Sequence, residues 1–208
     1  MSTRHLGWDA FIGTTDSNVS GVVSLNGWYL SATSNLVPDF TGLVASGWTH
    51  IDSLAGAGTR SQKLRMTIWG DAGGASGPST TLIGVTDEVI VNQATSLPAW
   101  IQFSAWTNFG GAPTLTPLTR YWVGLWYGTV AGSGQVNNNV DGSGTNPANA
   151  GGHSWFQTAV TYSTTANPSV ASWSDTGGIQ NDSLYFDYEG GTYTPVIVGQ
   201  PRPTFGPF

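Results

Sequence analysis

Carboxylates are the side chains of this sequence best able to do covalent chemistry, because it holds 12 Asp and Glu residues, 3 histidines and no cysteine. Asp182, Asp187 and Glu189 lie close together, and a glycosidase needs two carboxylates at a defined separation. Asp187 and Glu189 would share one face of a strand, because side chains alternate with period two. Two solvated acids on an outer face are the commoner origin of such a pair. We therefore predict no catalytic residue and no enzymatic activity.

Metal ligands are sparse and scattered. The histidines lie far apart and stand in no H-x-x-H or H-E-x-x-H pattern: His5, His50 and His153. The absence of cysteine excludes disulfides, thiolate metal sites and cysteine nucleophiles. A structural calcium ion bound by loop carboxylates stays open, with three acids as the nearest ligands: Asp71, Asp87 and Glu88. We predict no cofactor, and no metal apart from that calcium alternative.

Charge is scarce throughout the chain. Charged residues make up 9 % of it, against about 25 % in an average soluble protein. The net charge is −6 and Lys63 is the single lysine, so we set aside nucleic acid and membranes as partners. No apolar segment follows the first nine residues, and none reaches the ~18 apolar residues of a membrane span. We expect neither a signal peptide nor a membrane anchor.

Aromatic side chains are the stronger indication of a binding site, with 10 Trp, 7 Tyr and 8 Phe residues. Three tryptophans fall on the less regular faces of predicted strands. Exposed rings of this kind could stack on sugars while Asn side chains read hydroxyls, or could form a protein interface. A second core layer beneath a long loop is the alternative. The candidate glycan or protein-interface residues are Trp69, Trp122, Trp126, Asn137, Asn138 and Asn139.

Strands must position these residues, and the clearest is the run Thr119–Tyr127. One face of this run would hold Tyr121, Val123, Leu125 and Tyr127, and the other Arg120, Trp122, Gly124 and Trp126. Both faces carry large apolar groups. This pattern predicts a central strand covered on both sides, or a wall with an aromatic outer face.

Short strands separated by Gly and Pro recur along the rest of the chain. We predict strands within 48–54, 63–69, 82–91, 100–109, 155–162 and 184–188. Asn26-Gly27 indicates a hairpin, and the Gly- and Asn-rich segment 128–154 a long loop. No persuasive amphipathic helix is present. The fold class predicted is all-β, as a jelly-roll-like β-sandwich.

Two regions are expected, a β-sandwich domain over 1–193 and an extended strap over 194–208. The strap is rich in proline, which disfavours a central strand: Pro195, Pro201, Pro203 and Pro207. Phe205 and Phe208 give it two apolar anchors. We interpret it as a docking segment; an untethered tail is the alternative.

A series of motifs over about 60–127 resembles a known module. In order they are Leu64–Trp69, Asp71-Ala72-Gly73-Gly74, Gly77-Pro78, Leu82-Ile83-Gly84, Trp100-Ile101-Gln102-Phe103 and Tyr121-Trp122-Val123-Gly124-Leu125. This order resembles a β-sandwich module of tailed-bacteriophage virion proteins, particularly minor tail and fibre proteins, and of some bacterial surface proteins. The opening Phe11-Ile12-Gly13-Thr14 is similar to the start of those modules. The chain departs from the pattern at three positions: Trp69, Ser79 and Leu118.

The resemblance implies a structural virion protein of the tail or particle surface, with no catalytic centre to transfer. It implies other virion proteins and further copies of the chain as partners, since trimers are frequent in such fibres. Host-surface glycans are a further expected ligand, and the virion the expected location. A carbohydrate-binding module and a capsid decoration protein stay open as alternatives.

Overall fold

The computed structural model describes residues 2–7, 19–20, 29–36, 38, 41–55, 61–73, 77–106, 111–131, 135–138, 140–141, 155–158, 160–175, 181–182 and 184–190. Every regular element in these ranges is a β-strand, which confirms the all-β prediction. None of them contains a helix long and apolar enough to cross a membrane. The predicted Asn26-Gly27 hairpin and the 194–208 strap, with Phe205 and Phe208, lie outside the described residues.

The first sheet, sheet A, is organised around its longest strand, β4 (Gly42–Ala55). On one edge β4 pairs with β16 (Leu184–Gly190) and β11 (Gln135–Asn138), and on the other with β9 (Thr114–Leu115) and β8 (Ala99–Phe103). The strands β1 (Ser2–Gly7) and β2 (Val19–Ser20) pair with β16 and β11. All pairings are antiparallel, and the seven-stranded sheet is open.

The second sheet, sheet B, repeats this plan around β5 (Ser61–Asp71). One edge of β5 pairs with β10 (Tyr121–Ala131), and the other with β6 (Pro78–Val85) and β7 (Val89–Asn92). Beyond β10 follow β3 (Tyr29–Leu36), β13 (Trp155–Thr158) and β14 (Ser174–Asp175). A separate two-stranded sheet joins β12 (Val140–Asp141) to β15 (Asn181–Asp182).

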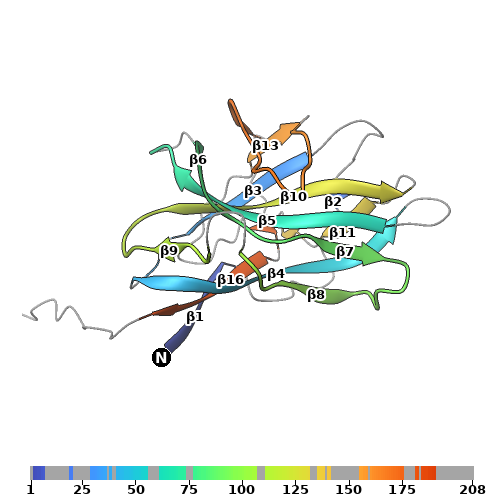
Figure 1. The fold of residues 1–208 in the computed structure, drawn as a ribbon, viewed down its shortest axis with the longest axis horizontal. Helices are drawn as coiled ribbons and strands as arrows, with labels where there is room; N and C mark the ends of the chain where they lie inside the picture. The colour runs from blue at the N-terminus through green and yellow to red at the C-terminus, as the bar shows by residue number, and fades with distance from the viewer. Residues whose placement is uncertain are drawn as a thin grey trace, which may run out of the picture.

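The main core lies where sheet A and sheet B share buried side chains. Its members alternate along three of the long strands, as period-two side chains require: Leu64, Met66 and Ile68 of β5, Tyr121, Val123, Leu125 and Tyr127 of β10, and Leu184, Phe186 and Tyr188 of β16. In β4 the core residues are Val44, Ile51 and Leu54, and register shifts in its pairing with β16 and β11 break the alternation. A Cβ on Gly47 of β4 would collide with the sulfur of Met66, which shows how closely the sheets approach. Figure 1 shows β4, β8 and β16 in one layer beneath β5 and β10.

The predicted central strand is confirmed and the predicted loop is partly corrected. β10 is paired on both edges and buried on both faces from Tyr121 to Gly128. The segment 128–154, expected to be loop, instead continues β10 to Ala131 and supplies β11 and β12. β11 pairs with β4 on the same edge as β16, although it contains polar residues such as Gln135 and Asn137. Strand pairing joins backbone N–H and C=O groups, so it does not require apolar side chains.

Candidate functional site

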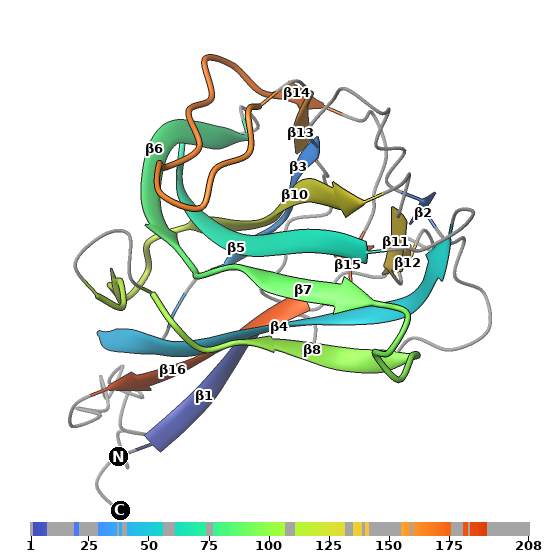
Figure 2. The ribbon, with the colours of Figure 1, turned by 45° about the vertical axis from the view of Figure 1, so that its right-hand side comes forward.

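The three tryptophans predicted to face a ligand are buried. Trp69 and Trp126 are 0 % exposed and Trp122 is 3 % exposed. They lie on the face of sheet B opposite the main core, in a second cluster with Val85, Val160 and Val170. Figure 2 shows the orange segment around β14 crossing beside β6, over this face. The prediction of a ligand-facing surface at these rings is therefore corrected, in favour of the second-core alternative.

Hydrogen bonds fix two of these rings within the second cluster. The Nε1 of Trp122 donates to Asp71 Oδ1 at 2.7 Å, and that of Trp69 donates to Thr67 Oγ1 at 2.9 Å. Trp173 packs edge-on against Trp69 with ring centroids 5.1 Å apart, and its own Nε1 donates to the Ser79 carbonyl at 3.0 Å. The chain after β13 thus covers rings that the strand pattern alone would leave on an outer face.

A buried arginine, Arg65, connects sheet B to residues 160–175, which lie over the second cluster and which we call the covering segment. The Nε of Arg65 donates to the Thr86 carbonyl, and its Nη1 donates to the Ser163 carbonyl, both at 2.6 Å. Its guanidinium carbon lies 5.4 Å from the ring centroid of Trp126, within range of a cation–π contact. Burial lowers the pKa of Arg65 from its ordinary value, and the nearby Tyr162 opposes that shift. These contacts make Arg65 a structural cation.

The calcium candidates are occupied by other contacts or exposed. Glu88 accepts a hydrogen bond from Tyr162 Oη at 3.0 Å and pairs with Lys63 Nζ at 3.3 Å. Asp71 accepts from Trp122, and Asp87 is exposed. Within the part of the chain that the structure describes, no group of three or more His, Asp or Glu side chains could hold a metal ion.

The asparagine candidates do not join the tryptophans. Asn137 and Asn138 lie in β11 of sheet A, where their backbones pair with β2 and β4, whereas the three tryptophans belong to sheet B. Asn139 lies outside the described residues. The six candidate residues therefore form no single site.

Partly exposed aromatic side chains gather instead on the outer face of sheet A. Trp48 of β4, Tyr185 of β16 and Trp100 of β8 come from three neighbouring strands. Trp48 pairs with Tyr185 on one edge of β4, and His50 pairs with Trp100 on the other. We call the set Trp48, Trp100, Tyr185, Gln102 and Asp187 the aromatic face.

The rings of the aromatic face are held in fixed relative positions. Trp48 and Tyr185 are nearly parallel, with an interplanar angle of 13° and centroids 6.1 Å apart. Trp100 meets Tyr185 edge-on at 5.1 Å and the buried His50 edge-on at 5.3 Å. Offset and edge-on arrangements are the favourable ones for aromatic pairs. Parts of all three rings nevertheless stay open to solvent.

Asp187 anchors this arrangement. Its Oδ2 accepts hydrogen bonds from Trp48 Nε1 at 2.8 Å and from Ser46 Oγ at 2.9 Å. Asp187 and the exposed Glu189 share the outer face of β16, as predicted, while Leu184, Phe186 and Tyr188 point into the core. Asp182 lies apart from them, in β15 of the two-stranded sheet. The carboxylate of Asp187 thus fixes the orientation of the Trp48 indole.

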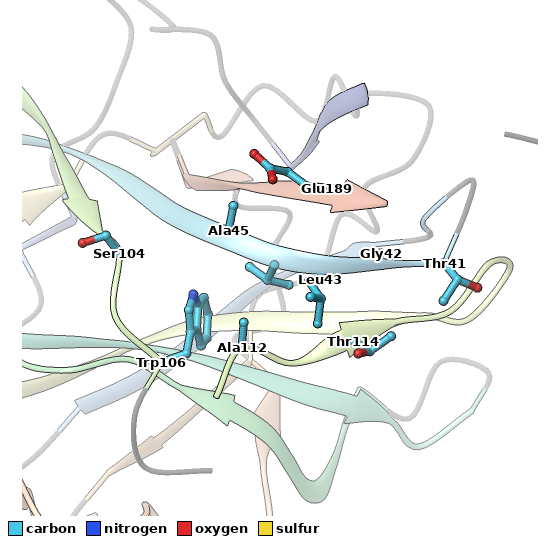
Figure 3. A pocket seen from close by; sticks show the side chains of 10 residues that line it. Thr41, Gly42, Leu43, Ala45, Ser104, Trp106, Ala112, Thr114 and Glu189 are labelled. Carbon is cyan, nitrogen blue, oxygen red and sulfur yellow. The ribbon is translucent and has the colours of Figure 1, made fainter. Parts of the chain in front are cut away.

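An apolar hollow of about 630 Å³ lies farther along β4. It opens on the edge of β4 that pairs with β9 and β8. Between Leu43, where the pairing with β9 ends, and Gly47, where the pairing with β8 begins, no strand pairs with this edge. Figure 3 shows the lining side chains around β4, from Glu189 on β16 to Trp106 and Thr114 beyond the opposite edge. Within the described structure the buried Nε1 of Trp106 makes no hydrogen bond.

The aromatic face was not predicted from the sequence, although the alternation of residues in two of its strands indicates outward-facing rings. Thr49 and Ile51 alternate with Trp48 and His50, and the same period places Trp100 opposite Ile101. Such alternation predicts outward rings but does not tell which strands become neighbours. The pairing of β4 with β8 and β16, far apart in sequence, creates the site.

Comparisons of the chain with protein-family models, with curated proteins and with solved structures find no match.

Proposed function

We propose that the chain is a jelly-roll-like β-sandwich that serves as a structural surface protein of a tailed-bacteriophage particle. It acts by binding and assembly, without catalysis and without a cofactor. Its partners are other virion proteins, further copies of the chain and the host surface. Two antiparallel seven-stranded sheets around a shared core support this proposal, together with the motif order over residues 60–127.

The aromatic face carries the binding part of the proposal. Trp and Tyr supply large contact areas at a small entropic cost, and they recur at the energetic centres of binding surfaces. Here Trp48, Trp100 and Tyr185 stand on paired strands and hold one another in place. Asp187 supports binding over catalysis, because its carboxylate oxygen accepts two hydrogen bonds from neighbouring side chains.

The location is tested on particles purified by density gradient from the phage that encodes this chain. Peptide mass spectrometry should find the chain at a constant copy number per particle, and immunogold labelling should place it on the surface. A chain that fractionates away from particles, as a free protein in the lysate, contradicts the proposal.

The binding face is tested on the same particles with two substitutions, Trp100→Ala and Tyr185→Ala. Adsorption to host cells or incorporation into particles should fall in both. Leu118→Ala provides the control, because Leu118 is 88 % exposed and lies outside the aromatic face. Normal incorporation and adsorption of both variants would remove the aromatic face from the proposed function.

A further inference from the structure

We infer that the aromatic face binds a neutral polysaccharide, with sugar rings stacked on Tyr185, Trp48 and Trp100 and hydroxyl groups bound by Gln102. This inference rests on the proposed function, because it assigns a ligand class to the same face. It concerns the outer face of sheet A, not the buried tryptophans of sheet B.

Preorganisation of the rings is the first argument. Trp48 is fixed by two contacts of its Nε1, at 2.8 Å to Asp187 Oδ2 and 3.1 Å to Ser46 Oγ. Tyr185 contacts both other rings, Trp48 in a nearly parallel arrangement and Trp100 edge-on. The side chains that a ligand would contact are therefore already held in place. Binding would cost little side-chain entropy.

The spacing of the rings is the second argument. They stand on β8, β4 and β16, which are consecutive neighbours in sheet A. The backbones of these strands lie about 4.8 Å apart, yet the rings converge, because the centroids of Tyr185 and Trp100, from the two outer strands, are 5.1 Å apart. A compact ring cluster of this kind suits a short stretch of a sugar chain, whose flat rings present C–H groups to aromatic faces. The ring centroids of Trp48 and Tyr185 are 6.1 Å apart, and both residues are partly exposed.

Polar groups beside the rings match hydroxyls. Gln102 is exposed and lies directly across from Trp48 in the β4–β8 pairing. Its amide has both donors and acceptors, as a sugar hydroxyl does. On β8 and β16 the charged side chains that the structure describes are acidic, Asp187 and the exposed Glu189, and the chain has a net charge of −6. This field repels acidic polysaccharides and favours neutral ones.

A protein partner fits this face less well. Among the described residues, three large aliphatic or aromatic side chains are classed as exposed: Leu43, Ile90 and Leu118. None belongs to the aromatic face, and Leu43 pairs with Glu189 near the far end of β4. The buried centre of a protein interface is apolar and depleted of charge. Within the described ranges, the aromatic face has no exposed aliphatic side chain, and it includes the carboxylate of Asp187.

Titration calorimetry with defined oligosaccharides tests the inference on the full chain. The probes are cellohexaose and hexa-N-acetylchitohexaose as neutral ligands, and hexagalacturonate as an acidic one. At least one neutral probe should bind, and the acidic probe should bind more weakly. No binding of either neutral probe, or tighter binding of the acidic one, would overturn the inference.

Variants locate the binding that calorimetry detects. Tyr185→Ala and Trp100→Ala should each weaken it by about tenfold, through loss of ring stacking. Gln102→Ala, an exposed change that leaves the core intact, should weaken it by about fivefold through loss of one hydrogen-bonding group. Trp173→Phe, in the segment that packs over sheet B, is the matched aromatic control and should bind as the parent does. Unchanged affinity in both Tyr185→Ala and Gln102→Ala, with folding verified by thermal melting, would overturn the inference.

Failure here is distinguishable from failure of the proposed function. If neutral sugars do not bind while Trp100→Ala and Tyr185→Ala still impair particle incorporation or adsorption, the ligand class is wrong and the binding face stands. If neutral sugars bind but the chain is absent from purified particles, the inference holds and the virion role fails.

Discussion

At the scale of single residues, Arg65 holds the segment 160–175 against the outer face of sheet B. It donates hydrogen bonds to three backbone carbonyls, two of them in the segment that closes over the second cluster: Thr86, Ser163 and Ala166. A buried carbonyl that loses its donor costs more than the bond itself contributes. Arg65 therefore links the covering segment to β5 more firmly than apolar contact would.

Replacing Arg65 with methionine should lower the free energy of unfolding by about 3 kcal/mol, because the carbonyls of Thr86 and Ser163 lose their charged donor. Guanidinium unfolding followed by tryptophan fluorescence measures the change. Lys63→Met on the same strand is the control, and removing its partly exposed ion pair with Glu88 should cost less than about 1 kcal/mol. Equal effects of the two substitutions would contradict the role given to Arg65.

Tyr162 predicts a pH dependence of stability. Burial raises the pKa of its phenol above the ordinary value near 10, and the neighbouring Glu88 carboxylate raises it further. The resulting stabilisation is fully present below pH 10. It is lost as the pH rises above 10, because the unfolded chain then releases a proton that the folded chain keeps.

Unfolding free energies measured between about pH 8 and pH 11 test this dependence. The parent should lose more stability over that range than Tyr162→Phe, in which the titrating hydroxyl is absent. The difference between the two slopes isolates Tyr162 from the other tyrosines. Parallel slopes would show that Tyr162 ionises equally in the folded and unfolded chains.

At the scale of elements, glycine in β10 permits the covering segment to pack against the strand. A Cβ on Gly128 would lie 2.5 Å from the Tyr162 ring, and the ring itself packs on Trp126 with centroids 4.9 Å apart. Gly128 also accepts a hydrogen bond from Gln62 Nε2 at 2.7 Å through its carbonyl. The strand therefore gains its close neighbour by having no side chain at this one position.

Gly128→Ala should destabilise the fold by about 2 kcal/mol, because the new methyl group overlaps an aromatic ring that is itself packed. Chemical denaturation measures the loss. In a Tyr162→Ala background the same substitution should cost less than about 0.5 kcal/mol, since the ring it meets is gone. Additive losses in the double variant would place the strain elsewhere.

The sequence predicts single strands well and their neighbours poorly. Alternation in Thr119–Tyr127 predicts both faces of β10 and its central place, and alternation in 184–188 predicts the core face of β16. The burial of Trp122 and Trp126 depends on residues 160–175 returning over sheet B, which a period-two pattern does not contain. The aromatic face needs the pairing of three strands distant in sequence, for which Trp48 and Trp100 carry no local signal.

At the scale of the whole molecule, the two sheets differ in what covers their outer faces. Sheet B carries a second apolar cluster closed by residues that follow β13, whereas sheet A presents partly exposed rings. Within the described part of the chain, the outer face of sheet B is therefore buried and that of sheet A is partly exposed. This asymmetry suits a module that turns one side to a ligand or a partner.

Solution mass tests the assembled state expected from the resemblance. Light scattering should show an oligomer for the full chain and a smaller species for a chain ending at Thr194, because the removed segment carries Phe205 and Phe208 as expected anchors. Phe205→Ser with Phe208→Ser in the full chain should reproduce the effect of the truncation. A monomer in every form would contradict the strap and favour an independent binding module.

One edge of each sheet is formed by two short strands in place of one long strand, which limits pairing between copies of this protein. β4 is flanked there by β9 and β8, and β5 by β6 and β7, all shorter than the strand they protect. A long exposed strand would offer a continuous template for cross-chain pairing and aggregation. Short, interrupted edges offer no continuous strand for such pairing. Charged residues make up 9 % of this chain, so charge repulsion between copies is weak, and the strand arrangement at these edges limits aggregation in its place.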